Sequence, residues 1–205
     1  MKKNNIKIIL ASESPRRIEM LREMGIDFEI RKHKHSEKHF EVKNPISFVK
    51  VCSKYKAQSA VANRDELVIG ADTIVFVEGK IIGKPSSKKS AKEMITLLSG
   101  KKHSVYTGLT LICNGRVVTG VQKTDVYFRE ICPAEIDAYL ESADYMDKAG
   151  AYAVQEEASL FIERISGDFF NVVGFPVLLF SLLFEEATGN ALYKTVWRNK
   201  KRKRG

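Results

Sequence analysis

The chain has 205 residues, of which 44% are hydrophobic and 29% charged, as in ordinary globular proteins. This composition excludes a largely disordered chain, and the longest apolar run, at 175–184, is well short of the ~20 residues of a membrane-spanning helix. The formal charge of +9 would suggest a nucleic-acid partner, but six basic residues lie at 198–204, and removing them leaves +3. We therefore expect a soluble protein with no membrane partner.

The cysteines and the N-terminus predict a cytoplasmic location. Cys52, Cys113 and Cys132 lie far apart and are odd in number, which suits a reducing compartment better than disulfides or a zinc site. The N-terminal apolar stretch has only about six residues, fewer than the apolar core of a secretory signal.

Strand-like and helix-like patterns alternate along the first third of the chain, which predicts a layered domain of α and β elements. We expect a strand over 6–12 and a helix over 15–24, with Pro15 in its first turn and Gly25 after its end. A short strand at 28–30 and a helix from Pro45 to about residue 62 follow.

The middle of the chain predicts two strands at 67–71 and 74–77, followed by a turn at Glu78-Gly79. Ser86 and Ser87 can cap a helix over 88–98. Two long strand patterns then meet at Asn114-Gly115, the strongest short-range signal of a β-hairpin.

The last third predicts a helix from Pro133, a strand at 159–165 and a mostly apolar helix within 167–187. No repeat or low-complexity linker divides the chain, so we expect one domain at 1–190 and a disordered basic tail at 191–205. The tail could contact nucleic acid, an anionic lipid or an import receptor, the last giving a nuclear location in a eukaryote, or it could simply aid solubility.

The stretch at 12–17 (SESPRR) has the chemistry of an anion site. It places the hydroxyls of Ser12 and Ser14, free backbone N–H groups and the guanidiniums of Arg16 and Arg17 where a strand leads into a helix. The alternative is a capping serine followed by two solvated arginines. Cations at a helix N-terminus oppose the helix dipole, however, which favours the phosphate-binding interpretation.

Asp72 directly follows the apolar strand pattern, at a position where α/β folds expose functional side chains. It could be a metal ligand, a general base or only a turn residue. Lys84 and Lys148 lie in loops beside glycine, proline or alanine, where each alone is more often a surface lysine. Together with further cations and carboxylates, these residues suit a polyphosphate and a divalent ion, whereas no Walker glycine pattern is present.

A second metal hypothesis concerns the charged loop that contains His33, His35, Glu37 and His39. This spacing could bind a transition metal, although histidines in such a loop are more often solvated.

Four blocks, in the right order and at the right spacing, resemble the signatures of the Maf family of nucleoside triphosphate pyrophosphatases. They are ILASESPRRIEMLREMGIDFE, VIGADTIVFVEGKIIGKP, HSVYTGLTLI and DKAGAYAVQEEASLFIERISGDFFNVVGFP, and the resemblance spans roughly residues 6–186. It implies an α/β fold related to the inosine triphosphatases: a mixed curved sheet flanked by helices, with two lobes and a central cleft. It also implies hydrolysis of the α–β phosphoanhydride to the monophosphate and pyrophosphate, a Mg²⁺ or Mn²⁺ cofactor, and a homodimer.

The resemblance also implies roles for individual residues. Asp72 and Glu37 would be the catalytic and metal-organising carboxylates. The residues that would bind the substrate are Ser12, Arg16, Arg17, Lys56, Thr73, Lys84, Lys148 and Gln155.

Three of these residues, Arg16, Thr73 and Gln155, resemble the specificity positions of the subtype that acts on dTTP and UTP. A glutamine amide can accept from N3–H and donate to O4 of uracil or thymine, and it can flip to suit cytosine unless neighbours fix it. The alternatives are a pyrophosphatase for 7-methyl-GTP or another modified nucleotide, and a nucleotide-sensing regulator of cell division without catalysis. Glu156 and Glu157 replace the small residues usual after this glutamine, which predicts negative charge near the base or phosphate site.

Overall fold

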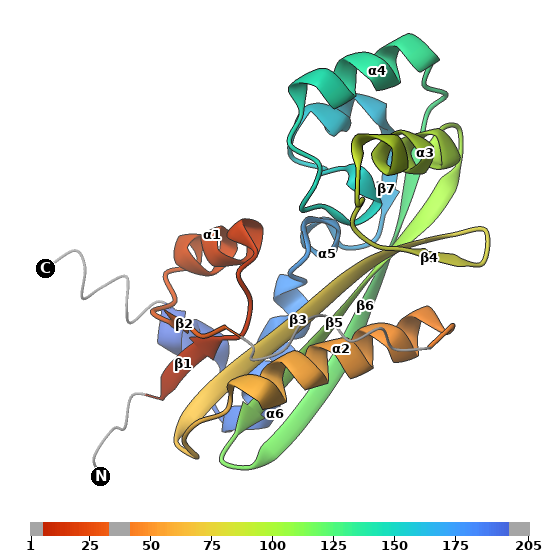
Figure 1. Ribbon diagram of the computed structural model, residues 1–205. Helices are drawn as coiled ribbons and strands as arrows, with labels where there is room; N and C mark the ends of the chain where they lie inside the picture. Colours follow the sequence, from red (N-terminus) through yellow and green to blue (C-terminus); the bar gives the residue numbers. More distant parts are fainter. Residues whose placement is uncertain (1–5, 33–41, 197–205) are drawn as a thin grey trace, which may run out of the picture.

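The computed structural model describes residues 6–32 and 42–196, in which a seven-stranded mixed sheet is flanked by helices (Figure 1). The strand order is β2-β1-β3-β5-β6-β7, with β4 (Lys80–Ile82) paired to β3 off this path. β1 (Lys7–Leu10) runs parallel to both β2 (Glu29–Ile30) and β3 (Glu66–Val77). The remaining pairs are antiparallel, so the mixed α/β expectation is confirmed.

Three long strands form the centre of the sheet. β5 (Lys102–Cys113) and β6 (Arg116–Phe128) are joined by the expected Asn114-Gly115 turn, at which both residues have positive φ. β3 is a single strand, so the expected break between residues 71 and 74 was wrong. Asp72 lies opposite Gly108 in the antiparallel ladder, and this pairing keeps the polar residues of β3 extended.

The helices begin where their sequences predict. α1 (Pro15–Glu23), α2 (Pro45–Ala60) and α4 (Pro133–Ser142) each begin with a proline, whose missing N–H costs nothing in the first turn. α3 (Lys88–Leu98) is capped by Ser87, whose hydroxyl accepts from the Ser90 N–H.

The C-terminal third differs from expectation at two points. Residues 157–161 form a 3₁₀ turn, and β7 (Ile162–Ser166) begins only after it. The expected single helix is two, α5 (Phe169–Val173) and α6 (Val177–Thr188). Gly174 ends α5 with a φ of 113°, and Pro176, which has no N–H to donate, prevents the first helix from continuing.

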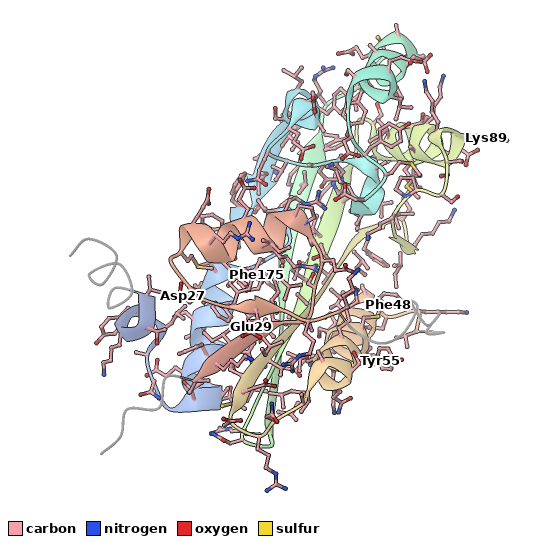
Figure 2. All side chains as sticks on the ribbon, turned by 60° about the vertical axis from the view of Figure 1, so that its left-hand side comes forward. Asp27, Glu29, Phe48, Tyr55, Lys89 and Phe175 are labelled. Atoms are coloured by element: carbon pink, nitrogen blue, oxygen red, sulfur yellow. The ribbon has the colours of Figure 1, made fainter. Side chains whose placement is uncertain are left out.

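Two hydrophobic clusters divide the molecule into two lobes at opposite ends of the sheet (Figure 1). One cluster packs α1 and α6 against the sheet and contains the fully buried Phe175, which lies close to α1 (Figure 2). The other packs α3 and α4 against the far ends of the long strands. Residues 192–196 are helical and Leu192 is buried in the first cluster, so the packed domain extends past the expected boundary at residue 190.

Two glycines set the distance between α2 and the sheet. A Cβ atom on Gly70 would lie 2.3 Å from the Ser53 carbonyl oxygen, and one on Gly108 would lie 2.3 Å from the Val49 carbonyl oxygen. Only strands without side chains at these points allow the helix backbone to pack so closely. None of the helices in residues 6–32 and 42–196 combines the length and hydrophobicity needed to cross a membrane.

Candidate active site

A cavity of about 760 Å³ lies where the start of α1, α2, β3 and the segment 147–155 approach one another. It brings together eight of the ten residues expected from the sequence: Ser12, Arg16, Arg17, Lys56, Asp72, Thr73, Lys84 and Gln155. The other two are Lys148, which does not line the cavity, and Glu37, which lies outside the described residues. His33, His35, His39 and the basic residues of the tail also lie outside them.

Asp72 and Lys56 form an ion pair in the cavity wall, with Nζ 2.5 Å from Oδ1. Their side chains are only 14% and 16% exposed, so water screens the pair little. The pair forms because α2 packs directly on β3 at Gly70, two residues before the aspartate. Oδ2 of Asp72 makes no hydrogen bond to the described residues and is therefore free to accept from a ligand.

Arg17 holds the cavity walls together. Its guanidinium donates to the Gly174 carbonyl at 2.9 Å, the Ser12 hydroxyl at 3.1 Å, the Ala71 carbonyl at 3.2 Å and the Thr73 hydroxyl at 2.9 Å. Burial lowers its pKa to about 10, partly offset by the charge of Asp72, so the group stays protonated at neutral pH. Most of its donors are thus committed to protein oxygens, and the expected direct contact of Arg17 with a triphosphate stays a prediction.

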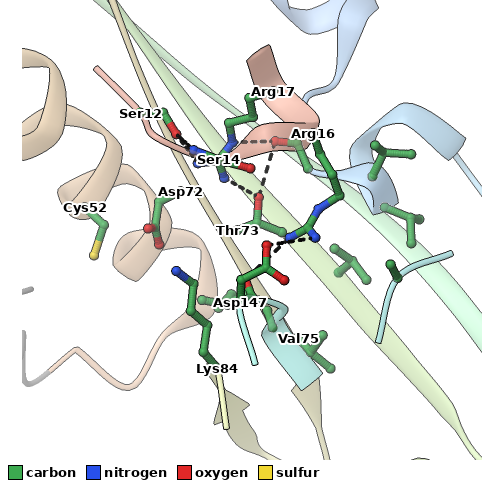
Figure 3. Close-up of a pocket in the computed structure, with 18 of the residues that line it drawn as sticks. Ser12, Ser14, Arg16, Arg17, Cys52, Asp72, Thr73, Val75, Lys84 and Asp147 are labelled. Carbon is green, nitrogen blue, oxygen red and sulfur yellow. Dashed lines mark hydrogen bonds and ion pairs between the residues drawn. The ribbon is translucent and has the colours of Figure 1, made fainter. Parts of the chain in front are cut away.

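Arg16, its neighbour in the first turn of α1, points into the cavity. Its two terminal nitrogens donate to a carboxylate oxygen of Asp147 at 3.2 Å and to the Asp147 carbonyl at 3.4 Å (Figure 3). Burial opposes ionisation of Asp147, but hydrogen bonding from Lys148 and the charge of Arg16 outweigh it and hold the pKa of Asp147 below its usual value. These long contacts leave Arg16 able to bind an anion.

Lys84 is exposed at the mouth of the cavity, after β4, and its side chain points toward Asp72 (Figure 3). Within the described residues its ammonium makes no hydrogen bond or ion pair. The cavity therefore contains a cation with no protein partner there, close to a carboxylate that already has one. Such an arrangement favours a polyanionic ligand.

The expected specificity residues differ in whether their side chains already have hydrogen-bond partners in the protein. The Thr73 hydroxyl accepts from Arg17 and lies 2.9 Å from the Thr107 hydroxyl, so the protein already uses it. The exposed Gln155 side chain lines the cavity and makes no hydrogen bond to the described residues. Its amide is available to a ligand, but no hydrogen bond from this part of the chain fixes which way it faces.

Lys148 is 3% exposed and does not line the cavity. This burial argues against the expected contact with substrate, which stays a prediction. Its ammonium is taken up by protein oxygens, among them Asp147 Oδ1 at 2.9 Å and Glu156 Oε2 at 3.3 Å. Glu156 is thereby paired with a cation, whereas the exposed Glu157 makes no ion pair within the described residues.

Sequence reasoning missed the apolar part of the cavity wall. Phe48, Cys52 and Tyr55 line it from α2, and Phe48 and Tyr55 are seen on that helix in Figure 2. Their spacing of four and three residues places them on one helical face, and this periodicity could have identified them. The wall gives a planar ring system a surface to lie against.

Comparison with protein-family profiles matches residues 7–187 to the family described as Maf-like protein. A dTTP/UTP pyrophosphatase of Bacillus anthracis is 48% identical over 173 residues, which cover 83% of this chain and 90% of the relative. One of Bacillus cereus is 47% identical over 176 residues, covering 85% and 86%. The residues matched to the family, 7–187, include all those that line the cavity.

Similarity to solved structures is more distant. A dITP/XTP pyrophosphatase from Mycobacterium abscessus is 16% identical, with a TM-score of 0.38 over 62% of this chain and 76% of that one. A Ham1 protein from Staphylococcus aureus is 12% identical, with a TM-score of 0.42 over 60% and 71%.

Proposed function

This chain belongs to the Maf-like protein family, and from that premise we propose that it is a nucleoside triphosphate pyrophosphatase acting on dTTP and UTP. The products are the nucleoside monophosphate and pyrophosphate. The observation that supports this most strongly is the cavity itself, in which Asp72 lies among Arg16, Lys56 and Lys84.

The cations bind the triphosphate. Arg16 offers a planar guanidinium at the N-terminus of α1, where the helix dipole also favours negative charge. Lys84 approaches from the opposite side of the cavity and has no partner among the described residues. Placed in advance, these charges stabilise the negative charge that develops as the phosphoanhydride breaks. Arg17 contributes by fixing Ser12 and Thr73 rather than by direct contact.

A divalent cation fits the donor set. No group of three His, Cys, Asp or Glu side chains able to bind a metal occurs within residues 6–32 and 42–196. Mg²⁺ needs only one or two carboxylates when substrate phosphates supply the other ligands, and the free Oδ2 of Asp72 suits that role. Glu37 stays a proposed second ligand. When bound, the ion would neutralise phosphate charge and acidify a water molecule.

Asp72 handles the proton of the attacking water. Its carboxylate is the acceptor in the cavity that lies closest to a cation, with Lys56 Nζ 2.5 Å from Oδ1. An ionised carboxylate can accept a proton directly or orient a water for attack on the phosphorus.

The base lies against the apolar wall formed by α2, and the Gln155 amide hydrogen-bonds to the polar edge of the base. The amide both accepts and donates, which matches N3–H and O4 of uracil and thymine. This part of the proposal predicts preference for UTP and dTTP over purine nucleotides.

The test is pyrophosphate release from a panel of canonical and modified nucleoside triphosphates with Mg²⁺, before and after chelation with EDTA. We expect turnover of dTTP and UTP that EDTA abolishes and added Mg²⁺ restores. Asp72→Asn is expected to remain folded and inactive. Full activity of that variant would refute the catalytic assignment, whereas binding without pyrophosphate release by the unaltered protein would indicate a nucleotide sensor.

We expect a cytoplasmic homodimer, with any nucleic-acid or import-receptor contact confined to the basic tail. The named relatives are bacterial, so they give no support to a nuclear location.

A further inference from the structure

Lys148 is a buried cation that the proposed chemistry does not use. It is 3% exposed, and its ammonium donates to the Asp144 carbonyl and pairs with Asp147 and Glu156. A buried ammonium is costly unless its charge is paired and its hydrogens are bonded. Here the ammonium donates two hydrogen bonds and forms a further ion pair with Glu156, which marks a built arrangement rather than a stray surface lysine.

The two carboxylates belong to opposite ends of one segment, residues 147–156, and both ends lead to the cavity. Asp147 contacts Arg16 through both its carboxylate and its carbonyl, at 3.2 and 3.4 Å. Glu156 directly follows Gln155, which lines the cavity. The Lys148 ammonium therefore contacts one residue that holds Arg16 and another that is adjacent to Gln155.

The backbone between these ends is held in an uncommon conformation. Gly150 has a φ of 72° and the fully buried Ala151 a φ of 61°, a region that costs a non-glycine residue about 1 kcal/mol or more. The Gly150 N–H donates to the Gly83 carbonyl at 2.9 Å, and the Tyr139 hydroxyl donates to the Ala151 carbonyl at 2.9 Å. Tertiary contacts thus fix the middle of the segment, and the ion pair to Lys148 fixes its end.

The position of Gln155 depends on that end. Its side chain makes no hydrogen bond within the described residues, so the position of its backbone limits where the amide can reach. The neighbouring Glu156 carboxylate is turned toward Lys148, at 3.3 Å, and anchors this backbone.

We propose that Lys148 and Glu156 are positioning residues for base recognition, acting on Gln155 through the shared backbone. This inference rests on the proposed pyrophosphatase function. Neither residue is proposed to touch the substrate. Loss of the pair is therefore expected to weaken binding of the base, whereas binding of the triphosphate and catalysis by Asp72 are unchanged.

The test compares Glu156→Gln with Glu157→Gln, which removes the same charge one residue later. Glu157 is exposed and makes no ion pair within the described residues. For Glu156→Gln we expect the KM for UTP to rise about tenfold and kcat to change less than twofold, as for the loss of one recognition hydrogen bond. The preference for UTP over ATP falls by the same factor, and Glu157→Gln behaves like the unaltered protein. Equal UTP/ATP preference in both variants would overturn the proposal.

A second measurement does not depend on turnover. Hydrogen–deuterium exchange of peptides covering 149–156 is expected to accelerate in Glu156→Gln and to stay unchanged in Glu157→Gln, because only the former releases the end of the segment. Unchanged exchange in both variants would overturn the positioning role. If the unaltered protein releases no pyrophosphate, the proposed function fails, and the positioning of Gln155 still stands or falls on the exchange result.

Discussion

Replacing Gly70 by alanine is expected to separate Lys56 from Asp72. The added Cβ would lie 2.3 Å from the Ser53 carbonyl oxygen and 2.6 Å from the Ala57 nitrogen, both backbone atoms of α2. Ordinary contact begins near 3.4 Å, so the helix must withdraw by about 1 Å at this point. Lys56 lies on the same helix, so this movement carries its backbone away from Asp72, with which it pairs at 2.5 Å.

The expected magnitude follows from the two affected interactions. Overpacking a close helix–sheet contact lowers the free energy of unfolding by about 1–3 kcal/mol, reduced by ~0.4–1 kcal/mol because alanine restricts the unfolded chain. Misplacement of a catalytic group by ~1 Å can lower kcat by about 100-fold. Activity is therefore expected to fall much more than stability.

The assay is pyrophosphate release from UTP together with urea denaturation. Gly120→Ala is the matched control, since it is the same substitution in β6 of the same sheet and its Cβ would meet only the flexible ends of the Leu179 and Leu183 side chains, at 2.7 and 3.3 Å. If Gly70→Ala matched Gly120→Ala in both kcat and stability, close packing of α2 would not be what places Lys56.

Three further outcomes are expected. Lys84→Met raises the KM for UTP about tenfold or more, since one charge-assisted hydrogen bond to phosphate is lost, and leaves the urea midpoint unchanged. Arg17→Met lowers the free energy of unfolding by about 3–5 kcal/mol, measured by urea denaturation, since it removes a buried cation bonded to four protein oxygens. Hydrogen bonds from Arg31, at 2.8 Å, hold the pKa of the buried Glu66 at about 2, below its usual 4.5. Because this pKa is lowered in the folded state, the ionised carboxylate stabilises the fold above pH 4.5 and the effect is lost as pH falls toward 2. Glu66→Gln should thus cost about 3 kcal/mol at pH 7 and little at pH 2, and an equal cost at both pH values would contradict the assignment.

Local chemistry in the sequence determined most helix starts, the β-hairpin and the residue types of the site. Proline at a first helical position and Asn-Gly between two strand patterns act on their immediate neighbours, so they can be read without a structure. A cluster of cations around one aspartate likewise predicted a polyphosphate site, and eight of the ten expected residues line one cavity.

Only the tertiary structure decided which of these residues face a ligand. Arg16 and Arg17 are adjacent and chemically identical. Arg17, however, donates its hydrogen bonds to protein oxygens, one of them the carbonyl of Gly174, 157 residues along the chain. Lys148 resembles Lys84 in its loop, but carboxylates that converge only on folding enclose it. The continuity of β3 through Asp72 likewise depends on its pairing with Gly108. The local sequence determines which interactions each side chain is able to make. Which of them it makes depends on the donors and acceptors that the fold brings to it, and residues far apart in the sequence supply most of those.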